Sequence, residues 1–355
     1  MGYSNSLRKR RDFTPANPTV DPTTSYAGVL SSPFVAPAMK LASTLVNGYV
    51  RQIDGIQSKA VISSLTSEDP LQAAAESCAW VDGADLTLGE RVLELTDLAV
   101  MQSLCRATLL PTWAGMGGAR ATMTAGSPEF VNFAMATVAA ATAQSVENNI
   151  WVGSSITAGF LANTGTFNNT GYGGSVIGLA SANEQTVSAT GFTTAILTQG
   201  TGAFDLAYTK AIDNCPAILN RPDVAYYVGT KLAGQYMTAL AVAGGGVSHI
   251  TATTVTTSGV GVNGQSTNQA FSSLQYLGVP IRVCPGMPAD AIILTYQDNL
   301  VVGSNLNTDY TSAQYIDHWK FSGSDETRIV IRFGLGMQVA VPGDLVVGAV
   351  AAIFA

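Results

Sequence analysis

Apolar residues recur at every third or fourth position between Ser127 and Trp151, which is the period of one face of an α-helix. Ser127 is a suitable N-cap, Pro128 suits the first helical position, and Gly153 follows as a stop signal. The alanine-rich sequence between the apolar residues favours a helix. We predict one helix over residues 127–151, roughly 37 Å long at 1.5 Å per residue. It would be either a buried core helix or the spine of a flat subunit.

Alternation of apolar and polar residues predicts a half-exposed strand over Leu86–Leu95. The preceding Asp82-Gly83 pair is a tight-turn signal. The region as far as Trp113 therefore predicts a hairpin. Two interpretations stay open: a hairpin within an ordinary sheet, or a long β-loop that protrudes from the body of the protein onto a neighbour.

The first 35 residues lack periodicity and are interrupted by prolines, which predicts an extended arm rather than part of a core. Residues 38–64 add a short helix at Ala38–Val46 and scattered apolar residues that do not close a core of their own. Residues 153–200 are rich in Gly, Asn, Thr and Ser, which predicts loops and short strands.

The other periodic segments mix helices with strands. Helices are predicted at Phe204–Leu219, Thr230–Ala243 and Asn268–Tyr276. Strands are predicted at Pro222–Val228, Val279–Cys284, Ala291–Tyr296, Arg328–Phe333 and Met337–Val341, with the last two paired to each other. Because there is no regular βαβ rhythm, the predicted class is α+β.

Charged residues make up only 12% of the 355 residues, about half of the usual share. Low charge combined with many small polar residues suits a protein whose surface is largely covered by copies of itself. A secreted β-rich protein is the alternative, because its surface also favours Thr, Asn and Gly. No apolar run is long enough to span a bilayer, and the N-terminus lacks the apolar core of a signal peptide.

The net charge of −7 argues against a nucleic-acid footprint over the whole chain. The basic residues cluster once, at Arg8, Lys9, Arg10 and Arg11. Two interpretations of this cluster stay open. It either contacts nucleic acid or an acidic partner on one face of an assembly, or it is a solvated, flexible tail.

Candidate chemistry is sparse. The two histidines, His249 and His318, have no partner residues at metal-ligand spacing. Gly259–Gly264 matches the pattern GxGxxG, but it lacks the surrounding βαβ unit of a dinucleotide site. The four cysteines are widely spaced, and we expect them to be reduced and buried. We assign no catalytic residue, no cofactor-binding residue and no metal ligand, which favours a structural protein over an enzyme.

An ordered series of segments carries a resemblance to a known family. In the last third it comprises Leu274–Ile281, Cys284–Pro288, Ile292–Gly303, Asp309, Arg328–Ala340 and Pro342–Gly348. Glu147–Gly153 and Leu86–Leu95 extend it toward the N-terminus. Taken in order from Leu71 to Val347, the series resembles the major capsid proteins of tailed bacteriophages.

The resemblance implies the Hong Kong 97-like capsid fold, an α+β fold built from four parts. These would be an N-terminal arm (1–65), an extended β-hairpin loop (66–115), a peripheral domain with the spine helix at 127–151 (116–214 and 305–355) and an axial domain (215–304). The face of the spine helix that packs on its own sheet would comprise Phe130, Ala134, Val138 and Ala141. The opposite face would point to the lumen or to a neighbouring subunit through Asn132, Gln144 and Asn148.

The implied function is shell building. Identical subunits would form hexamers and pentamers that close an icosahedral virion shell around double-stranded DNA, assembled in the cytoplasm of a bacterial host. The further partners would be a portal protein at one vertex and a decoration or scaffolding protein, with no membrane and no cofactor. Arg8–Arg11 would lie on the inner or intersubunit face. The alternatives are an encapsulin-like cargo compartment and, from another class, a secreted surface-layer or adhesin-type protein.

Two features of some relatives are not expected in this chain. A scaffolding extension or cleaved N-terminal region is not evident, so we expect no maturation cleavage. Covalent cross-linking would need a lysine in the extended loop, and Leu71–Trp113 contains none, so we expect no cross-links.

Overall fold

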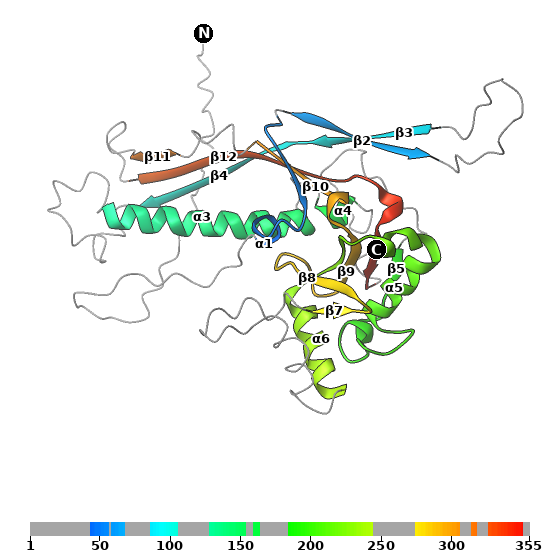
Figure 1. Cartoon of the computed structure of the whole chain (residues 1–355). Coiled ribbons are helices and arrows are strands. Elements are labelled where there is room, and N and C mark those ends of the chain that lie inside the picture. The colour runs from blue at the N-terminus through cyan, green and yellow to red at the C-terminus, as the bar shows by residue number, and fades with distance from the viewer. Residues whose placement is uncertain are drawn as a thin grey trace, which may run out of the picture. The chain divides into compact units, whose positions relative to one another are not determined.

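The computed structural model describes residues 43–56, 58–67, 86–105, 128–153, 159–163, 184–243, 274–305, 314–317 and 326–350. Internal contacts divide the chain into two compact units, which are described one at a time (Figure 1). The first unit comprises residues 1–37, 99–138 and 311–332, and the second comprises residues 38–98, 139–310 and 333–355. The cluster at Arg8–Arg11, the two histidines and Gly259–Gly264 lie outside the described residues.

The predicted long helix is confirmed as α3, which runs without a break from Pro128 to Trp151 over 24 residues. Gly153 follows its end with a φ of 80°, a left-handed conformation that glycine adopts without strain. Residues 128–138 belong to the first unit and residues 139–151 to the second.

The buried side chains of α3 do not lie on a single face. Val138 is 7% exposed and Ala141 is half-buried, whereas the side chains of Phe130 and Ala134 lie outside the described part of the chain. The buried Glu147 projects from the side of the helix opposite to Val138, because successive residues are turned by about 100°. The predicted packing face therefore stays a prediction at Phe130 and Ala134. In the last turns of the helix, the buried side chain of Glu147 lies on a different face.

The second unit contains a six-stranded sheet with the strand order β5-β13-β9-β6-β8-β7. Its strands are β5 (Glu184–Thr186), β13 (Val346–Ala349), β9 (Ala291–Tyr296), β6 (Val224–Val228), β8 (Val279–Val283) and β7 (Gln275–Tyr276). The pairs β5–β13 and β6–β8 are parallel and the others are antiparallel. Strands β9 and β6 are buried at every position, as their continuous apolar sequence predicts.

Helix α5 (Ala203–Asn214) packs on this sheet through a buried stripe that includes Phe204, Ala207 and Ala211. Helix α6 runs from Thr230 to Ala243, so its predicted bounds are confirmed. The short helices among the described residues of the unit are α1 (Ser43–Val46), α4 (Phe160–Asn163), η3 (Ala189–Phe192), η4 (Pro216–Asn220), η7 (Gln297–Asn299) and η9 (Pro342–Asp344).

The prediction of a helix at Asn268–Tyr276 is wrong for its described end. Gln275 and Tyr276 form β7, which pairs with β8 across a two-residue turn at Leu277 and Gly278. Both turn residues have positive φ, 48° and 84°, which is the conformation that lets a tight hairpin follow the twist of its strands. At this position the pairing of β7 with β8 therefore determines the backbone conformation, although the spacing of apolar residues is that of a helix.

A second sheet is built around β12, a strand of 14 residues from Glu326 to Val339. In the second unit its C-terminal half pairs antiparallel with β10 (Leu300–Ser304), which pairs parallel with β1 (Arg51–Asp54). In the first unit its N-terminal half pairs antiparallel with β11 (Gln314–Asp317). Strand β4 (Thr96–Cys105) also pairs with β12.

The predicted pairing of Arg328–Phe333 with Met337–Val341 is wrong, because β12 includes the first segment and most of the second. Gly334 and Gly336 therefore do not form a turn. A Cβ atom on Gly336 would lie 2.1 Å from the carbonyl oxygen of Glu94, so this glycine permits a close approach of another backbone.

Strands β2 (Lys59–Ser67) and β3 (Leu86–Glu94) form a separate two-stranded ribbon (Figure 1). They pair antiparallel over their whole length. The predicted strand at Leu86–Leu95 is confirmed, but its partner lies upstream. The predicted boundary between arm and extended loop, at residues 65 and 66, falls inside β2.

The six-stranded sheet also crosses the other predicted boundaries. Strands β5 and β13 lie in segments assigned to the peripheral domain, yet they pair in the sheet with β9 and β6. Strand β10, assigned to the axial domain, pairs instead with β1 and β12. The division into peripheral and axial domains stays a prediction.

Candidate functional site

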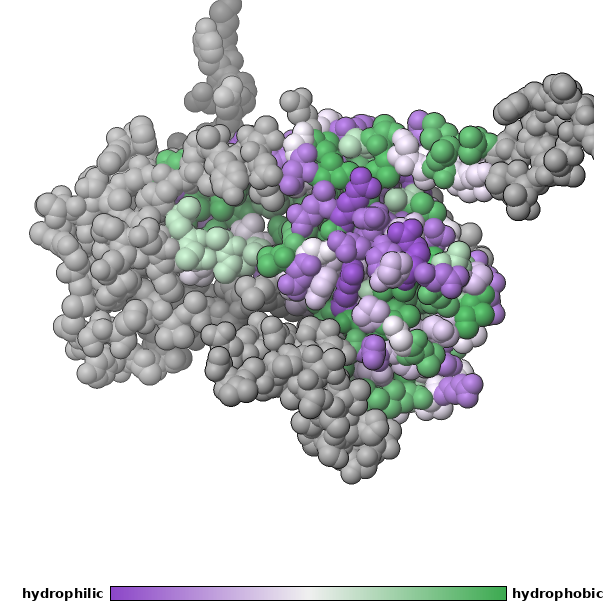
Figure 2. Space-filling model, viewed as in Figure 1, coloured by the Kyte–Doolittle hydropathy of each residue, from purple (hydrophilic) through white to green (hydrophobic). Residues whose placement is uncertain are grey.

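One face of the ribbon exposes a row of large apolar side chains, which we call the ribbon face. Its members are Val61 (58% exposed), Leu65 (66%), Leu86 (66%), Leu88 (62%) and Val92 (44%). Residues two apart on a strand share a face, and Val61 lies opposite Val92 while Leu65 lies opposite Leu88. Figure 2 shows hydrophobic residues along the ribbon.

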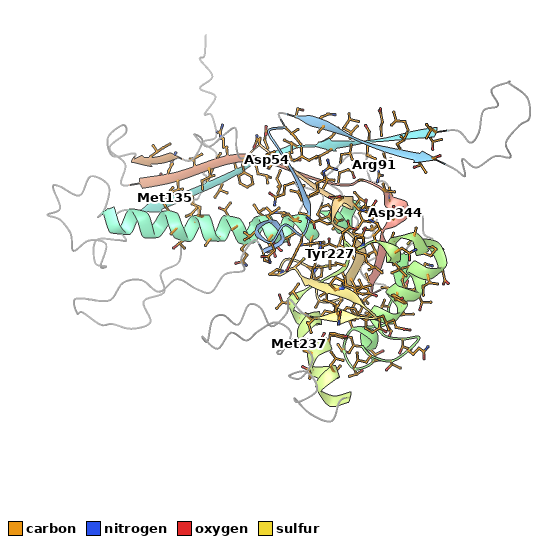
Figure 3. All side chains as sticks on the ribbon, in the orientation of Figure 1. Asp54, Arg91, Met135, Tyr227, Met237 and Asp344 are labelled. Atoms are coloured by element: carbon orange, nitrogen blue, oxygen red, sulfur yellow. The ribbon has the colours of Figure 1, made fainter. Side chains whose placement is uncertain are left out.

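The other face of the ribbon attaches its base to the rest of the second unit. Ile62 and Leu93 are buried there in a cluster with Ile56 and Val301. The guanidinium of Arg91 (Figure 3) donates a hydrogen bond of 3.0 Å to the carbonyl oxygen of Val339 in β12. The base is thus fixed by apolar burial and by a hydrogen bond to backbone.

Toward its tip the attached face becomes polar. Ser64 lies opposite Gly89, and Thr66 lies opposite Thr87, whose hydroxyl donates to the Thr66 carbonyl at 3.2 Å. The tip therefore has its apolar residues on the exposed ribbon face. A two-stranded ribbon is only marginally stable in water by itself, so this face suits a partner surface that covers it.

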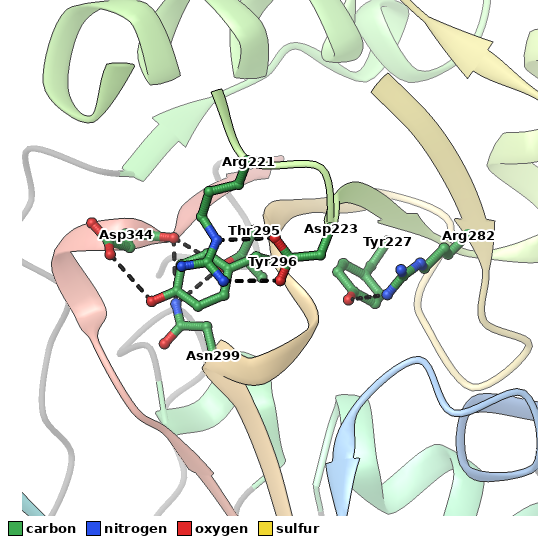
Figure 4. A network of polar contacts seen from close by, with 8 residues as sticks. All are labelled: Arg221, Asp223, Tyr227, Arg282, Thr295, Tyr296, Asn299 and Asp344. Carbon is green, nitrogen blue, oxygen red and sulfur yellow. Dashed lines mark hydrogen bonds and ion pairs between the residues drawn. The ribbon is translucent and has the colours of Figure 1, made fainter. Parts of the chain in front are cut away.

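A polar network in the second unit joins β9 to the segment before β13 (Figure 4). The side-chain amide of Asn299 donates to the carbonyl oxygens of Val341 and Asp344 at 2.9 and 3.3 Å. The hydroxyl of Thr295 donates to the same Asp344 carbonyl at 2.8 Å, and the hydroxyl of Tyr296 donates to its carboxylate at 3.2 Å. Because most of its acceptors are backbone carbonyls, this network holds the chain between β12 and β13.

The edge of this network is an ion pair. Arg221 donates two hydrogen bonds to Asp223, at 2.9 and 3.0 Å, and these hold the pKa of Asp223 below its usual value. The Arg221 guanidinium also lies 3.8 Å from the ring centre of Tyr296. Burial raises the pKa of Tyr296 to about 12. Tyr296 therefore stays neutral at ordinary pH and acts here as a hydrogen-bond donor.

Other candidate chemistry is limited in the described residues. Cys215 and Cys284 are free and buried, as predicted, and burial raises the pKa of the Cys215 thiol to about 11. The described ranges contain no group of three or more side chains suited to hold a metal ion. Among the helices that the structure describes, none is long and apolar enough to cross a bilayer.

The ribbon face was only half anticipated by sequence reasoning. Leu86, Leu88 and Val92 belong to the predicted strand, whereas Val61 and Leu65 lie in a segment assigned to the arm. The available signal was the period of two that places Val61, Ser63 and Leu65 on one face of a strand. This signal is weak, because Ser63 is polar and the apolar Ile62 falls on the opposite face. The residues predicted for nucleic-acid contact, Arg8–Arg11, lie outside the described residues.

No protein-family model matches the sequence, and no curated protein matches it. Solved structures match over most of the chain. The capsid of a native GTA particle is 14% identical, and the match covers 91% of this chain and 95% of that one with a TM-score of 0.54. A structure from Gordonia phage Cozz is 12% identical, with 92% of each chain covered and a TM-score of 0.54.

A third match, from Mycobacterium phage Adephagia, is 10% identical, covers 90% of this chain and 94% of that one, and has a TM-score of 0.51. At these identities the likeness concerns the fold. The chain has the fold of phage and GTA capsid structures, and the predicted Hong Kong 97-like α+β fold is confirmed.

Proposed function

We propose that this chain is the major capsid protein of a tailed bacteriophage and that it builds the virion shell. The shared fold with the capsid of a GTA particle, over 91% of the chain, supports a structural and non-enzymatic role. In this proposal identical subunits form hexamers and pentamers, which close an icosahedral shell around double-stranded DNA. A portal protein at one vertex and a decoration or scaffolding protein are the further proposed partners.

The exposed ribbon face is the observation that carries the proposal. Its members are 44–66% exposed, although each is a valine or a leucine. A soluble monomer rarely leaves such a row uncovered, whereas a shell subunit can lay it on a neighbour. The low share of charged residues, 12%, agrees with a surface that is largely buried between copies.

The ribbon also offers a matched test. Leu65→Ser combined with Leu88→Ser removes one cross-strand apolar pair from the ribbon face. Thr66→Ser combined with Thr87→Ser is the control, because it changes the next cross-strand pair on the other face and keeps both hydroxyls. Negative-stain microscopy and analytical ultracentrifugation of the purified proteins should show closed shells for wild type and control. The leucine variant should remain as folded, unassembled subunits.

Normal shells from the leucine variant would contradict the role of the ribbon face. A wild-type protein that forms no closed particle, even with its phage partners co-expressed, would contradict the capsid function itself. Shells that contain a packaged enzyme rather than DNA would point to a cargo compartment of the same architecture.

The N-terminal arm, residues 1–65 in the prediction, is proposed to lie over neighbouring subunits. Removal of residues 1–40 should leave a foldable subunit that does not form stable particles. Circular dichroism measures folding and electron microscopy measures assembly. Normal particles from the truncated chain would refute this role.

The basic cluster is proposed to lie on the inner or intersubunit face, where it would make weak, non-specific contacts with packaged DNA. Replacement of Arg8, Lys9, Arg10 and Arg11 by glutamine should lower either particle yield or DNA content, measured by absorbance of purified particles. If both stay at wild-type values, the cluster is a solvated tail.

The absence of covalent cross-links also stays a prediction. The ribbon begins earlier than predicted and therefore contains one lysine, Lys59, which forms an ion pair with Glu94 at the base. A single band on denaturing gels of mature particles is expected, and a ladder of multimers would refute the prediction.

A further inference from the structure

A buried carboxylate lies in the last turns of α3. Glu147 is fully buried, and its hydrogen-bond donors are uncharged. The backbone N–H of Thr44 donates to its Oε2 at 3.2 Å, and the hydroxyl of Thr44 donates to its Oε1 at 2.5 Å. The N–H of Gly286 is more distant, at 3.5 Å from Oε1. Thr44, which lies 103 positions earlier in the chain, therefore supplies two of these hydrogen bonds.

The same threonine serves a second group of α3. The indole Nε1 of Trp151 donates to the hydroxyl oxygen of Thr44 at 3.0 Å, and both residues are fully buried. One hydroxyl thus donates to Glu147 and accepts from Trp151. Its removal would leave a buried indole N–H without an acceptor as well as a buried carboxylate with fewer donors.

A second attachment follows five residues later, at Tyr49. Its carbonyl oxygen accepts a hydrogen bond of 2.8 Å from the hydroxyl of Tyr227 in β6 (labelled in Figure 3) and one of 3.4 Å from Arg282 in β8. Arg282 also donates to the Tyr227 hydroxyl at 2.9 Å (Figure 4). The Trp151 ring lies 5.6 Å from the Tyr227 ring, so the two attachments are in contact.

We propose that residues 43–50 form a clasp that can open and close over the end of α3 and the six-stranded sheet, with the Glu147 carboxylate as the group that it covers. The clasp is held at two points, Thr44 and Tyr49, and continues directly into β1. This inference concerns the single chain and does not depend on the proposed capsid function.

Opening and closing of the clasp should be coupled to a proton. Burial raises the pKa of Glu147 above its usual value, and the hydrogen bonds that its carboxylate accepts, chiefly those from Thr44, act in the opposite direction. When the clasp opens, water reaches the carboxylate and this burial effect is lost. The closed state therefore binds a proton more tightly than the open state. Closure is strongest below the ordinary glutamate pKa of about 4.3 and weakens as the pH rises through the higher pKa of the closed state.

The described groups around Glu147 do not change charge between pH 5 and pH 8. Burial raises the pKa of the Cys284 thiol in the β8–β9 connection, and also the pKa values of Tyr49 and Tyr227. These three groups stay neutral in that range. Among the described residues, Glu147 is the group whose titration would move the clasp.

Hydrogen exchange with mass spectrometry on the full chain tests the proposal, because protection factors report the opening of each segment. In the wild type, protection of residues 43–50 should fall as the pH rises from 5 to 8, by at most about tenfold per pH unit for one proton. Protection in β9 should not follow this profile. Glu147→Gln should abolish the pH dependence, since a glutamine does not titrate. A profile that survives in this variant, or one of opposite sign, would overturn the coupling.

The attachment through Thr44 is tested by an isosteric pair. Thr44→Val removes the hydroxyl and should lower protection of residues 43–50 by roughly tenfold or more, given the worth of a hydrogen bond to a charged group. Thr44→Ser keeps the hydroxyl and should stay near the wild type. Equal protection in both variants would overturn the clasp.

A second pair of variants keeps the proposal testable if the Thr44→Val variant does not fold. Tyr227→Phe removes the donor to Tyr49 and should loosen residues 43–50 while leaving the pH profile intact. Tyr226→Phe is its control, because the neighbouring Tyr226 hydroxyl is buried and has no hydrogen-bond partner in the described structure. If Tyr227→Phe leaves the segment as protected as Tyr226→Phe does, the second attachment is refuted.

Discussion

Strands β9 and β3 both carry leucines, but they place them in opposite surroundings. Leu294 in β9 is fully buried, whereas Leu88 in β3 is 62% exposed. Strand β9 lies between β13 and β6, and α5 packs against it. Strand β3 pairs with β2 in a ribbon of two strands. The six-stranded sheet is therefore stabilised by its own hydrophobic core, while the ribbon leaves apolar side chains exposed to another surface.

The largest difference in stability is expected between two leucine-to-alanine variants, one in the six-stranded sheet and one in the ribbon. Leu294→Ala should lower the free energy of unfolding by about 2–5 kcal/mol, because it removes buried methyl groups and leaves a cavity. Leu88→Ala should change it by no more than about 0.5 kcal/mol. Urea unfolding of the unassembled chain measures both. Similar losses in the two variants would mean that the ribbon face is covered within the single chain.

A smaller effect is expected where the ribbon meets β12. Gly336→Ala places a methyl group against the carbonyl oxygen of Glu94 and should cost about 1–3 kcal/mol, because backbone has to move. Gly343→Ala is the control, since a Cβ there would have no neighbour within 4 Å. Hydrogen exchange should show that residues 86–94 lose protection in Gly336→Ala while β9 retains it. Uniform loss through both regions would show that ribbon and sheet unfold together.

The smallest effect should come from the ion pair at the ribbon base. The side chains of Lys59 and Glu94 are 61% and 39% exposed, so solvent screens their attraction. A double-mutant cycle with Lys59→Gln and Glu94→Gln should give a coupling energy below about 1 kcal/mol, which falls further in high salt. A larger, salt-independent coupling would contradict the view that the ribbon is held chiefly by Ile62 and Leu93.

Local signals predicted much of the fold. Helices α3 and α6 and strands β6 and β9 were found near their bounds, because period, capping and glycine stops act over a few residues. Two predictions of secondary structure were wrong, and each involves a glycine with a different structural role. Gly278 forms a turn next to a segment with a helical period, whereas Gly336 lies within a long strand. The same residue type permits a positive φ in one case and a close backbone approach in the other.

The candidate site was harder to predict than the fold. Leu86 and Leu88 stood out by alternation, but alternation does not say which face is covered. The answer depends on the register with β2, which brings Leu65 opposite Leu88 and buries Ile62 on the other side. A one-residue shift would have reversed the two faces. The sequence of β2 has no strong pattern of its own, so the predicted boundary between arm and extended loop was placed inside this strand.

By itself the sequence determined the long helix from Pro128 to Trp151, the buried strands of the six-stranded sheet, and the low charge of the surface. These follow from side-chain spacing and composition, which need no partner. Only the tertiary structure decided that Glu147 on that helix is covered by Thr44, and that β2 pairs with β3. Both contacts depend on which distant segments of the chain pack together and exclude water. The free-energy change of burying a carboxylate or an apolar face arises only when those segments are in contact.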